Sequence, residues 1–443
     1  MKKLIETLKN IWKIEDLKQR ILITVLFIAI YRFGSYVVLP GIDPSSLTKL
    51  SAQTSTGLMS LLDMFSGGAF SHASILALGI MPYISASIVI QLLAIAVPYF
   101  QRLQNEGESG RTKINQYTRY LTIAILFLQA PSYLINLQSQ VGQSFDLLFI
   151  LTSTIILAAG SMFVLWLGER ITDKGIGNGV SFIILVGIIA RLPQALFQEF
   201  IARMASPGAG GLVMFLIEII FLLLVIGAAI LLVQGTRKIP VQYVKRVEGS
   251  RQYEGPRKYI PLKVNAANVM PIIFAQAIMF IPIAIIGFSQ VANASGVARD
   301  LVDHTSILYN VIFAVMVVFF TYFYTAITVN PKQMSDDLMR SNGFVPGIKP
   351  GKATTEYIDE IMSRITLPGA LFLALIAILP AFAGMFGIKE GFAQFFGGTS
   401  LLILVGVVLD TLQQVESHLM MRHYDGLMNS GRIKGRVGGV SAY

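Results

Sequence analysis

The sequence predicts an all-α integral membrane protein, and three observations support this fold class. The chain has 443 residues, of which 54% are hydrophobic and only 14% charged, and its mean hydropathy is +0.65. Soluble domains carry about 25% charged residues. The apolar residues form long runs, and about 20 apolar residues in a helix match a hydrocarbon core about 30 Å thick. The Lys and Arg residues concentrate in alternate segments between these runs.

Ten apolar runs predict ten membrane-spanning helices. The fifth run is the weakest, because Arg191 and Pro193 interrupt it. Residues 1–20 are polar and rich in lysine, which predicts a cytoplasmic amphipathic helix rather than a cleaved signal peptide. The ten runs lie near 21–39, 74–97, 118–137, 147–167, 180–200, 212–233, 268–288, 307–329, 366–386 and 397–417.

The charges between the runs predict the orientation. With the N-terminus in the cytoplasm, 29 of the 35 Lys and Arg residues lie on the cytoplasmic side, 5 lie on the opposite side, and Arg32 lies inside the first run. Cytoplasmic loops of membrane proteins carry such an excess. Both termini are therefore expected in the cytoplasm, which requires an even number of spans.

Two cytoplasmic loops, 234–265 and 330–365, are longer than a helical hairpin needs. The first loop is strongly basic, and the second contains a Pro- and Gly-rich turn at 343–351. Two interpretations remain open from the residues alone. The charge either sets topology and attracts anionic lipids, or it forms a docking surface for a partner.

The segment 58–74, LMSLLDMFSGGAFSHAS, is too short to span and is broken by Asp63, Gly67, Gly68 and His72. A charge at the centre of a spanning helix costs about 2.5–3.5 kcal/mol. Irregular backbone at membrane depth is tolerated where it is buried in protein or lines a cavity. These features favour a re-entrant half-helix, and the alternative is an amphipathic helix on the outer membrane surface.

The sequence gives little support for an enzymatic function. The sequence has no cysteine and shows no zinc-protease, serine-hydrolase or phosphate-loop motif, so we expect no catalytic residues, metal or cofactor. The ionisable residues within the runs, Arg32, Glu218 and Asp410, are too scattered for a proton relay, and we expect Arg32 to extend outward. A small-molecule secondary transporter remains the alternative, because half-helices can bind substrate through backbone groups.

Seven motifs in order give the chain a specific resemblance. They are YRFG at 31–34 with PGI at 40–42, DMFSGG at 63–68, ALGIMPYISASI at 77–88, GIGNG at 175–179, IPLKVN at 260–265, FVPGIKPG at 344–351 and GTSLLI at 398–403. Through them the chain resembles the SecY family of protein-conducting channels. We expect GIGNG to be a tight turn that opens the fifth helix, because no strand precedes it.

The resemblance implies a fold of ten helices in two pseudo-symmetric halves around a central pore. The halves would be 21–205 and 206–417, with a re-entrant plug near 58–72 and a cytoplasmic tail at 418–443. By the same resemblance, a hydrophobic pore ring falls on Ile80, Ile84, Ile184, Ile188, Ile273 and Ile403, with a slip within 182–185 left open. The plug includes Leu61, Asp63, Met64, Phe65, Gly67 and Gly68.

The resemblance also implies a function. Unfolded secretory polypeptides would cross through the pore, and transmembrane segments would leave sideways through a lateral gate with a polar lining of Ser85, Gln91 and Asn268. Ser85, Ser87 and Gln91 also share a helical stripe by spacing alone. The implied partners are SecE and SecG, the motor ATPase SecA, the ribosome, signal peptides and nascent polypeptides, with the protein in the bacterial inner membrane. Cytoplasmic docking would use Arg237, Lys238, Lys245, Arg246 and Lys349.

Overall fold

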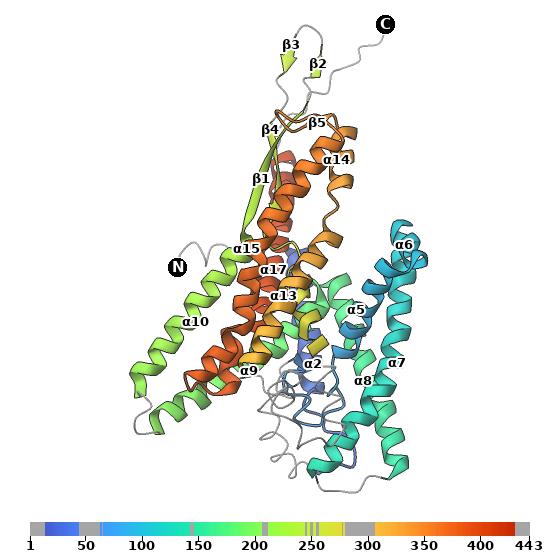
Figure 1. Ribbon diagram of the computed structural model, residues 1–443. Helices are drawn as coiled ribbons and strands as arrows, with labels where there is room; N and C mark the ends of the chain where they lie inside the picture. The colour runs from blue at the N-terminus through green and yellow to red at the C-terminus, as the bar shows by residue number, and fades with distance from the viewer. Residues whose placement is uncertain are drawn as a thin grey trace.

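The computed structural model describes residues 14–43, 63, 65–141, 146–205, 211–243, 246–248, 251–253, 257–276, 278–279 and 306–429. Within these residues the protein is mainly helical, with a small sheet at one end (Figure 1). The helices are α2 Glu15–Gly34, α5 Met81–Ala96, α6 Pro98–Asn105, α7 Glu108–Val141, α8 Leu147–Lys174, α9 Gly179–Ala205, α10 Gly211–Gln234, α13 Ile307–Thr328, α14 Pro331–Arg340, α15 Lys352–Met385, α16 Glu390–Ala393 and α17 Gly398–Asn429, with a 3-10 turn η2 at Gln394–Phe396.

The helices confirm a multi-pass membrane protein. Among the described residues, 6 helices are long and apolar enough to cross a membrane, or up to 7 if one bent pair is a single span. The six are α8, α9, α10, α13 continued by α14, α15 and α17, and the bent pair is α5 with α6. Helices α2 and α7 occupy two further predicted ranges, and residues 270–276 and 278–279 are helical at the start of another. The arrangement is consistent with ten spans. Residues 1–13 of the expected amphipathic helix lie outside the described residues.

The second predicted span begins later than its apolar run. Residues 75–80 are turns, and α5 starts at Met81 with Pro82 in its first turn. Proline is favoured there because the first helical N–H groups have no partner within the helix. Gly79, with φ of 52°, lies just before this start. The apolar run 74–97 is therefore longer than the helix that it forms, and the chain bends by 102° between α5 and α6.

The fifth predicted span is a continuous helix. Helix α9 runs from Gly179 to Ala205 with Pro193 inside it. The predicted tight turn precedes it: the Gly179 N–H donates to Thr172 Oγ1 at 2.8 Å, and the Ser181 N–H donates to Asn178 Oδ1 at 3.2 Å. A Cβ on Gly179 would lie 1.9 Å from the Gly168 carbonyl oxygen. Only glycine therefore allows α8 and α9 to approach this closely.

The two long loops fold together into a small module at one end of the helices. Strand β1 Thr236–Tyr243 pairs antiparallel with both β4 Arg257–Lys263 and β5 Gly343–Phe344, and β2 Arg246–Glu248 pairs with β3 Arg251–Tyr253. The first loop thus supplies two strands of the larger sheet and the second loop supplies the third. Their shared hydrophobic core contains Ile239, Val241, Leu262, Leu338, Val345, Ile358 and Met362. We call this unit the sheet module.

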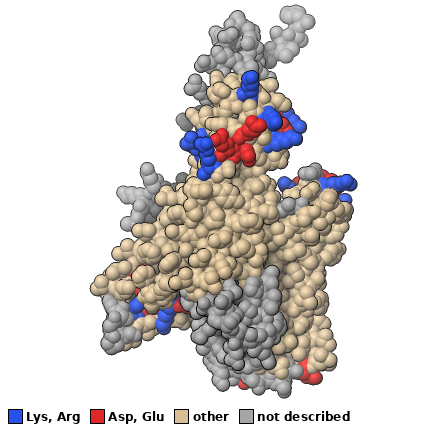
Figure 2. Space-filling view, in the orientation of Figure 1, with Lys and Arg blue, Asp and Glu red and all other residues tan. Residues whose placement is uncertain are grey.

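Charged side chains are unevenly distributed over the molecule. On the face shown in Figure 2, Lys, Arg, Asp and Glu gather on the sheet module and near α6, with a few more at the opposite end of the helices. The broad band across the helices shows other residues. Exposed apolar residues are common on the helices, for example Leu224 at 64% and Leu231 at 75%. This distribution is typical of a protein whose middle faces lipid.

A buried charged cluster lies at the end of α9 remote from the sheet module. Arg203 Nε lies 2.9 Å from Glu199 Oε1, and Arg203 Nη2 lies 2.6 Å from Glu218 Oε1 on α10. Glu199 Oε2 accepts the backbone N–H of Lys389 at 2.9 Å. All three charged side chains are buried. The cluster joins α9, α10 and the turn before α16.

Candidate pore and plug

The six isoleucines expected in the pore ring come from four separate parts of the chain and belong to one hydrophobic cluster. Ile80, Ile184, Ile188 and Ile403 are between 0% and 7% exposed. Ile84 and Ile273 are half-buried and pack against the same cluster. Ile80 precedes α5 and Ile84 follows one turn later, Ile184 and Ile188 are one turn apart on α9, Ile273 lies in the helical segment from 270, and Ile403 lies on α17.

The plug segment is irregular after its first residues. Asp63 and Phe65 have helical backbone, whereas residues 66–73 form turns, and Leu61 and Met64 lie outside the described residues. The Gly68 N–H donates to the Asp63 carbonyl at 2.9 Å, and the Ile75 N–H donates to the Val37 carbonyl at 2.9 Å. Such bonds satisfy backbone groups that a helix would otherwise pair. A buried irregular segment is what the re-entrant interpretation requires.

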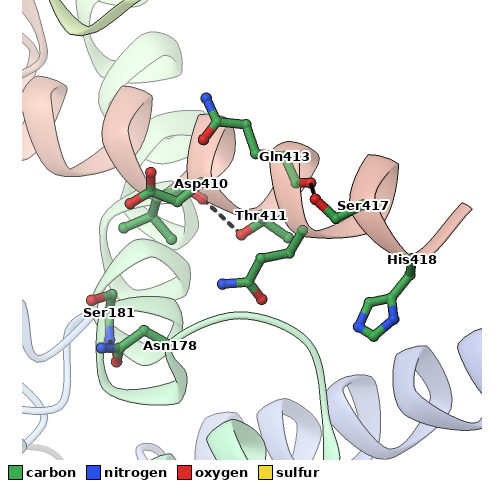
Figure 3. A pocket seen from close by; sticks show the side chains of 9 residues that line it. Asn178, Ser181, Asp410, Thr411, Gln413, Ser417 and His418 are labelled. Atoms are coloured by element: carbon green, nitrogen blue, oxygen red, sulfur yellow. Dashed lines mark hydrogen bonds between the residues drawn. The ribbon is translucent and has the colours of Figure 1, made fainter. Parts of the chain in front are cut away.

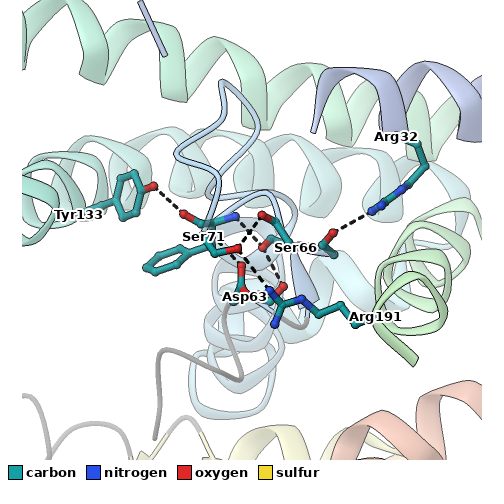
Figure 4. Close-up of polar contacts among 9 residues, drawn as sticks. Arg32, Asp63, Ser66, Ser71, Tyr133 and Arg191 are labelled. Carbon is teal, nitrogen blue, oxygen red and sulfur yellow. Dashed lines mark hydrogen bonds and ion pairs between the residues drawn. The ribbon is translucent and has the colours of Figure 1, made fainter. Parts of the chain in front are cut away.

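Asp63 is the fully buried charge of this segment, at 0% exposure. Its carboxylate forms an ion pair with Arg191 on α9, and its Oδ1 accepts the Ser71 N–H at 2.7 Å. Arg191 Nη2 also donates to Ser71 Oγ at 3.3 Å (Figure 4). The two charges that interrupted separate apolar stretches of the sequence therefore compensate each other. A buried charge needs such a partner.

Side chains from two other helices donate to carbonyl groups of the segment. Tyr31 on α2 donates its hydroxyl to the Ser66 carbonyl at 3.0 Å, and Arg32 Nη1 donates to the Gly67 carbonyl at 2.8 Å. Tyr133 on α7 donates to the Phe70 carbonyl at 2.9 Å (Figure 4). Arg32 Nη2 also donates to the Tyr36 hydroxyl at 3.3 Å, so the guanidinium that was expected to extend outward lies between Tyr36 and the plug. Helices α2, α7 and α9 together hold the segment in place.

Two glycines permit the closest contact between plug and helix. A Cβ on Gly67 would lie 2.8 Å from Gly187 Cα, and a Cβ on Gly187 would lie 3.0 Å from the Phe65 carbonyl oxygen. Gly67 also has a φ of 64°, and its neighbour Gly68 has a φ of 92°. Both values favour glycine. The backbone of the plug therefore rests directly on α9, in the turn just before Ile188.

His72 lies at the edge of the plug. Its ring centroid is 5.4 Å from that of Tyr36, and Arg32 lies over the same Tyr36 ring at 5.4 Å. Burial, and secondarily the positive charge of Arg32, hold the pKa of His72 below its usual value. The neutral form of the His72 imidazole is therefore favoured beside the Arg32 guanidinium. A second positive charge at this position is disfavoured.

The residues expected to line the lateral gate lie on two elements. Ser85 and Gln91 are half-buried on α5, and Gln91 Nε2 donates to Ser87 Oγ at 3.3 Å along the predicted polar stripe. Asn268, with φ of 52°, lies in the turn before the helical segment at 270. Helix α5 packs mainly on α7, whereas α13 packs mainly on α15. The resemblance places the gate between the second and third spans on one side, here α5 and α7, and the seventh and eighth on the other, here the segment from 268 and α13. The helices on the two sides thus have separate main partners.

The expected docking residues lie on the sheet module where the structure describes them. Arg237 and Lys238 are exposed on β1, and Lys349 is exposed in the turn after β5. Lys245 lies outside the described residues, and of Arg246 only the backbone in β2 is described. The antiparallel pairing of Gln242 with Phe344 connects the two loops that carry these residues.

An open, polar cavity of about 500 Å³ lies between the start of α9 and the middle of α17 (Figure 3). We call it the vestibule. Its lining residues are Asn178, Ser181, Val407, Asp410, Thr411, Gln413, Gln414, Ser417 and His418. Gln414 Oε1 accepts the Gly177 N–H at 2.9 Å, which connects α17 to the turn before α9.

Sequence reasoning did not find Tyr31, Tyr133 and Arg191 as residues that hold the plug. Arg191 carried a usable signal, because an ionisable residue in an apolar span usually has an oppositely charged partner in the protein. The Asp63 carboxylate, in the segment 58–74, was a possible partner for Arg191. Tyr31 and Tyr133 gave no comparable signal, since tyrosine is common in spanning helices.

Comparison with known proteins now defines the class. The fold is that of a multi-pass α-helical membrane protein. The SecY family model matches residues 74–412. The chain is 40% identical over 433 residues to the protein translocase subunit SecY of Streptomyces scabiei, covering 94% of this chain and 98% of that protein. It is also 40% identical over 445 residues to the same subunit of Thermotoga maritima, covering 97% and 99%. The chain belongs to the SecY family, whose members are protein-translocation channel subunits and not enzymes.

Solved structures agree on the fold. "The structure of a protein conducting channel" superposes with a TM-score of 0.61 at 16% identity, covering 90% of this chain and 92% of the other. "Sec61 in the Canine ribosome-channel complex from the endoplasmic reticulum" superposes with a TM-score of 0.56 at 15% identity, over 90% and 92% of the two chains. The transporter alternative is not favoured.

Proposed function

We propose that this chain forms the pore of a bacterial inner-membrane translocase, with the six isoleucines as its constriction and residues 58–72 as its plug. The observation that supports this best is the position of the plug. Gly67 rests on Gly187, which lies next to Ile188 in α9. Unfolded secretory polypeptides pass where these isoleucines pack, once the plug moves away.

The chemistry of the constriction suits a seal that must also open. Isoleucine side chains offer no hydrogen bonds, so a narrow ring of them dewets and resists ions. The same lack of specific contacts allows the ring to fit around any polypeptide sequence. The hydrogen bonds from Tyr31 and Tyr133 to the plug are each worth about 0.5–1.5 kcal/mol net, and those that involve a charge, from Arg32 and Arg191, about 1.5–3 kcal/mol. Such a segment can be displaced without unfolding the helices around it.

The lateral route for apolar segments lies between α5 and α7 on one side and the segment from 268 with α13 on the other. Ser85, Gln91 and Asn268 supply its polar lining. Helices α5 and α13 each pack mainly on a helix of their own side, so the two groups can separate while each keeps its packing. A signal peptide or a transmembrane segment would leave through that opening into lipid.

The sheet module is the docking surface for the partner that drives transport, either the motor SecA or a ribosome. The solved ribosome-bound relative supports a partner of that kind. The module is a folded unit with its own core, and it presents Arg237, Lys238 and Lys349. We place it, with both termini, in the cytoplasm, where it also lies close to anionic lipids. SecE and SecG are the expected membrane partners.

Site-specific crosslinking during transport tests this function. A photoreactive residue at Ile84 should capture the translocating polypeptide, and one at Lys349 should capture the motor or the ribosome. Ile220, which is 64% exposed on α10, serves as the control position and should capture neither. Capture of the polypeptide from Ile220 but not from Ile84 would disprove the assigned path.

A further inference from the structure

The vestibule borders the hydrophobic cluster to which the six isoleucines belong. Val407 lines the vestibule, packs against this cluster and lies one turn from Ile403 on α17. On α17, Ile403 and Val407 are one turn apart, and Asp410 and Thr411 follow one turn further on, so these residues share one face of the helix. On α9, Ser181 precedes Ile184 by three residues and lies on the same side. A polypeptide that reaches the isoleucines along these two helices passes the vestibule.

The lining of the vestibule has a distinctive chemistry. Most of its polar groups are uncharged amides and hydroxyls, which can exchange hydrogen bonds with the peptide groups of an extended chain. Asp410 contributes the one carboxylate among the described residues of this lining, and His418 is the other titratable side chain among them. Among the residues that the structure describes, the lining includes no Lys or Arg, although the chain as a whole carries 35 of them against 25 acidic residues.

The Asp410 carboxylate is available to a ligand. The residue is exposed, and among the described residues it takes part in none of the ion pairs. Its side chain lines the vestibule together with Asn178 and Ser181 of α9 (Figure 3). An unpaired carboxylate beside neutral hydrogen-bonding groups favours a cation.

We propose that the vestibule is a subsite for a cationic side chain, Lys or Arg, of the polypeptide in transit, with Asp410 as the residue that determines this preference. This inference rests on the proposed function and adds charge selectivity to it. Asn178, Ser181 and Gln413 hold the neighbouring peptide groups. The subsite retains basic segments just before the constriction, whereas acidic segments pass it without attraction.

The test uses the complete channel in membranes with its motor and a polypeptide arrested in transit. The arrested stretch is uncharged except for one position, which carries Lys, Gln or Glu, and a photoreactive residue replaces Gln413. An exposed ion pair is worth about 0.2–1 kcal/mol, which corresponds to a preference of up to about fivefold. Capture should therefore decrease from Lys to Gln to Glu, with Lys captured up to about fivefold more than Gln. Asp410→Asn should remove this preference, and Asp410→Lys should reverse it.

Glu416→Gln is the matched control, because Glu416 is an exposed carboxylate on the same helix but outside the vestibule lining. It should leave the preference unchanged. Two results would overturn the subsite: equal capture of Lys and Gln in the unaltered channel, or a preference for Lys that survives Asp410→Asn. In either case, capture from Ile84 would still support the pore. Absence of capture from both Gln413 and Ile84 overturns the pore itself and the subsite with it.

Discussion

Arg203 Nη2 lies 2.6 Å from Glu218 Oε1, and this buried ion pair joins α9 to α10. Glu199 lies on the other side of the same guanidinium, at 2.9 Å from Nε. One cation therefore compensates two carboxylates in a water-poor place. Removing one partner from a buried ion pair is strongly destabilising, because it leaves an uncompensated charge.

Arg203→Gln should lower the stability of the folded protein by about 3–5 kcal/mol, since Glu199 and Glu218 would remain buried without a cation. Thermal or denaturant unfolding of the detergent-solubilised protein measures the change. Arg364→Gln is the control, because Arg364 pairs with Glu360 at the surface, where both side chains are more than half exposed. That variant should change stability by less than about 1 kcal/mol. Equal stability of the two variants would contradict the role of the cluster.

Asp63→Asn should raise the ion leak of the resting channel. The change leaves Arg191 without its carboxylate partner and weakens the attachment of the plug to α9. Conductance across planar bilayers measures the leak. If the two residues act as one pair, combining Asp63→Asn with Arg191→Gln should raise the leak by less than the two single effects together. Glu356→Gln, at an exposed ion pair, should leave the seal intact, and a tight seal in Asp63→Asn would count against the plug.

Gly187→Ala should also loosen the plug, for a steric reason. The added methyl group would lie 3.0 Å from the Phe65 carbonyl oxygen and 3.2 Å from the Gly67 nitrogen, so the plug backbone must shift away from α9. We expect a higher resting leak and faster crosslinking of a cysteine placed in the plug. Gly227→Ala on α10 is the matched control, since no atom lies within 4 Å of its added methyl group. If both variants behave alike, the close approach is not functional.

Ile80→Ser and Ile273→Ser should each let ions pass, because a hydroxyl in a dewetted constriction offers water a hydrogen bond. The expected change is a higher resting conductance, and combining the two substitutions should raise it further. Ile220→Ser, on the exposed face of α10, provides the comparison. An unchanged seal in Ile80→Ser, Ile273→Ser and their combination would show that these positions do not form the constriction.

Much of the helical architecture could be predicted from the sequence, because lipid restricts spanning segments to long apolar helices. The GIGNG turn and the irregular segment around Gly67 and Gly68 were likewise predictable from local residue chemistry. The predicted start of α5 was too early, because the turns at 75–80 that precede the helix are also rich in apolar residues. Hydropathy measures the environment of a residue and does not report where a helix begins.

The partners of the plug could not be predicted, because contacts such as that of Asp63 with Arg191 depend on how distant helices pack. The sheet module was missed for another reason. Its strands are short and rich in Arg and Lys, and positive-inside topology already explained those charges. A signal was present in the alternation of Ile239 with Val241 and of Ile260 with Leu262, which has the period of a strand. The pairing of β1 with β5 across two loops had no local signal.

Helix α15 extends without a break from the sheet module into the helical bundle. Its 34 residues span about 50 Å at 1.5 Å per residue. Ile358 near the start of α15 belongs to the module core, and α15 also packs on α13. Gly369, also on α15, abuts the end of β4, where an added Cβ would lie 2.8 Å from the Val264 carbonyl oxygen. One helix therefore connects the sheet module to the bundle, and we expect a force applied to the module to reach the helices that α15 contacts.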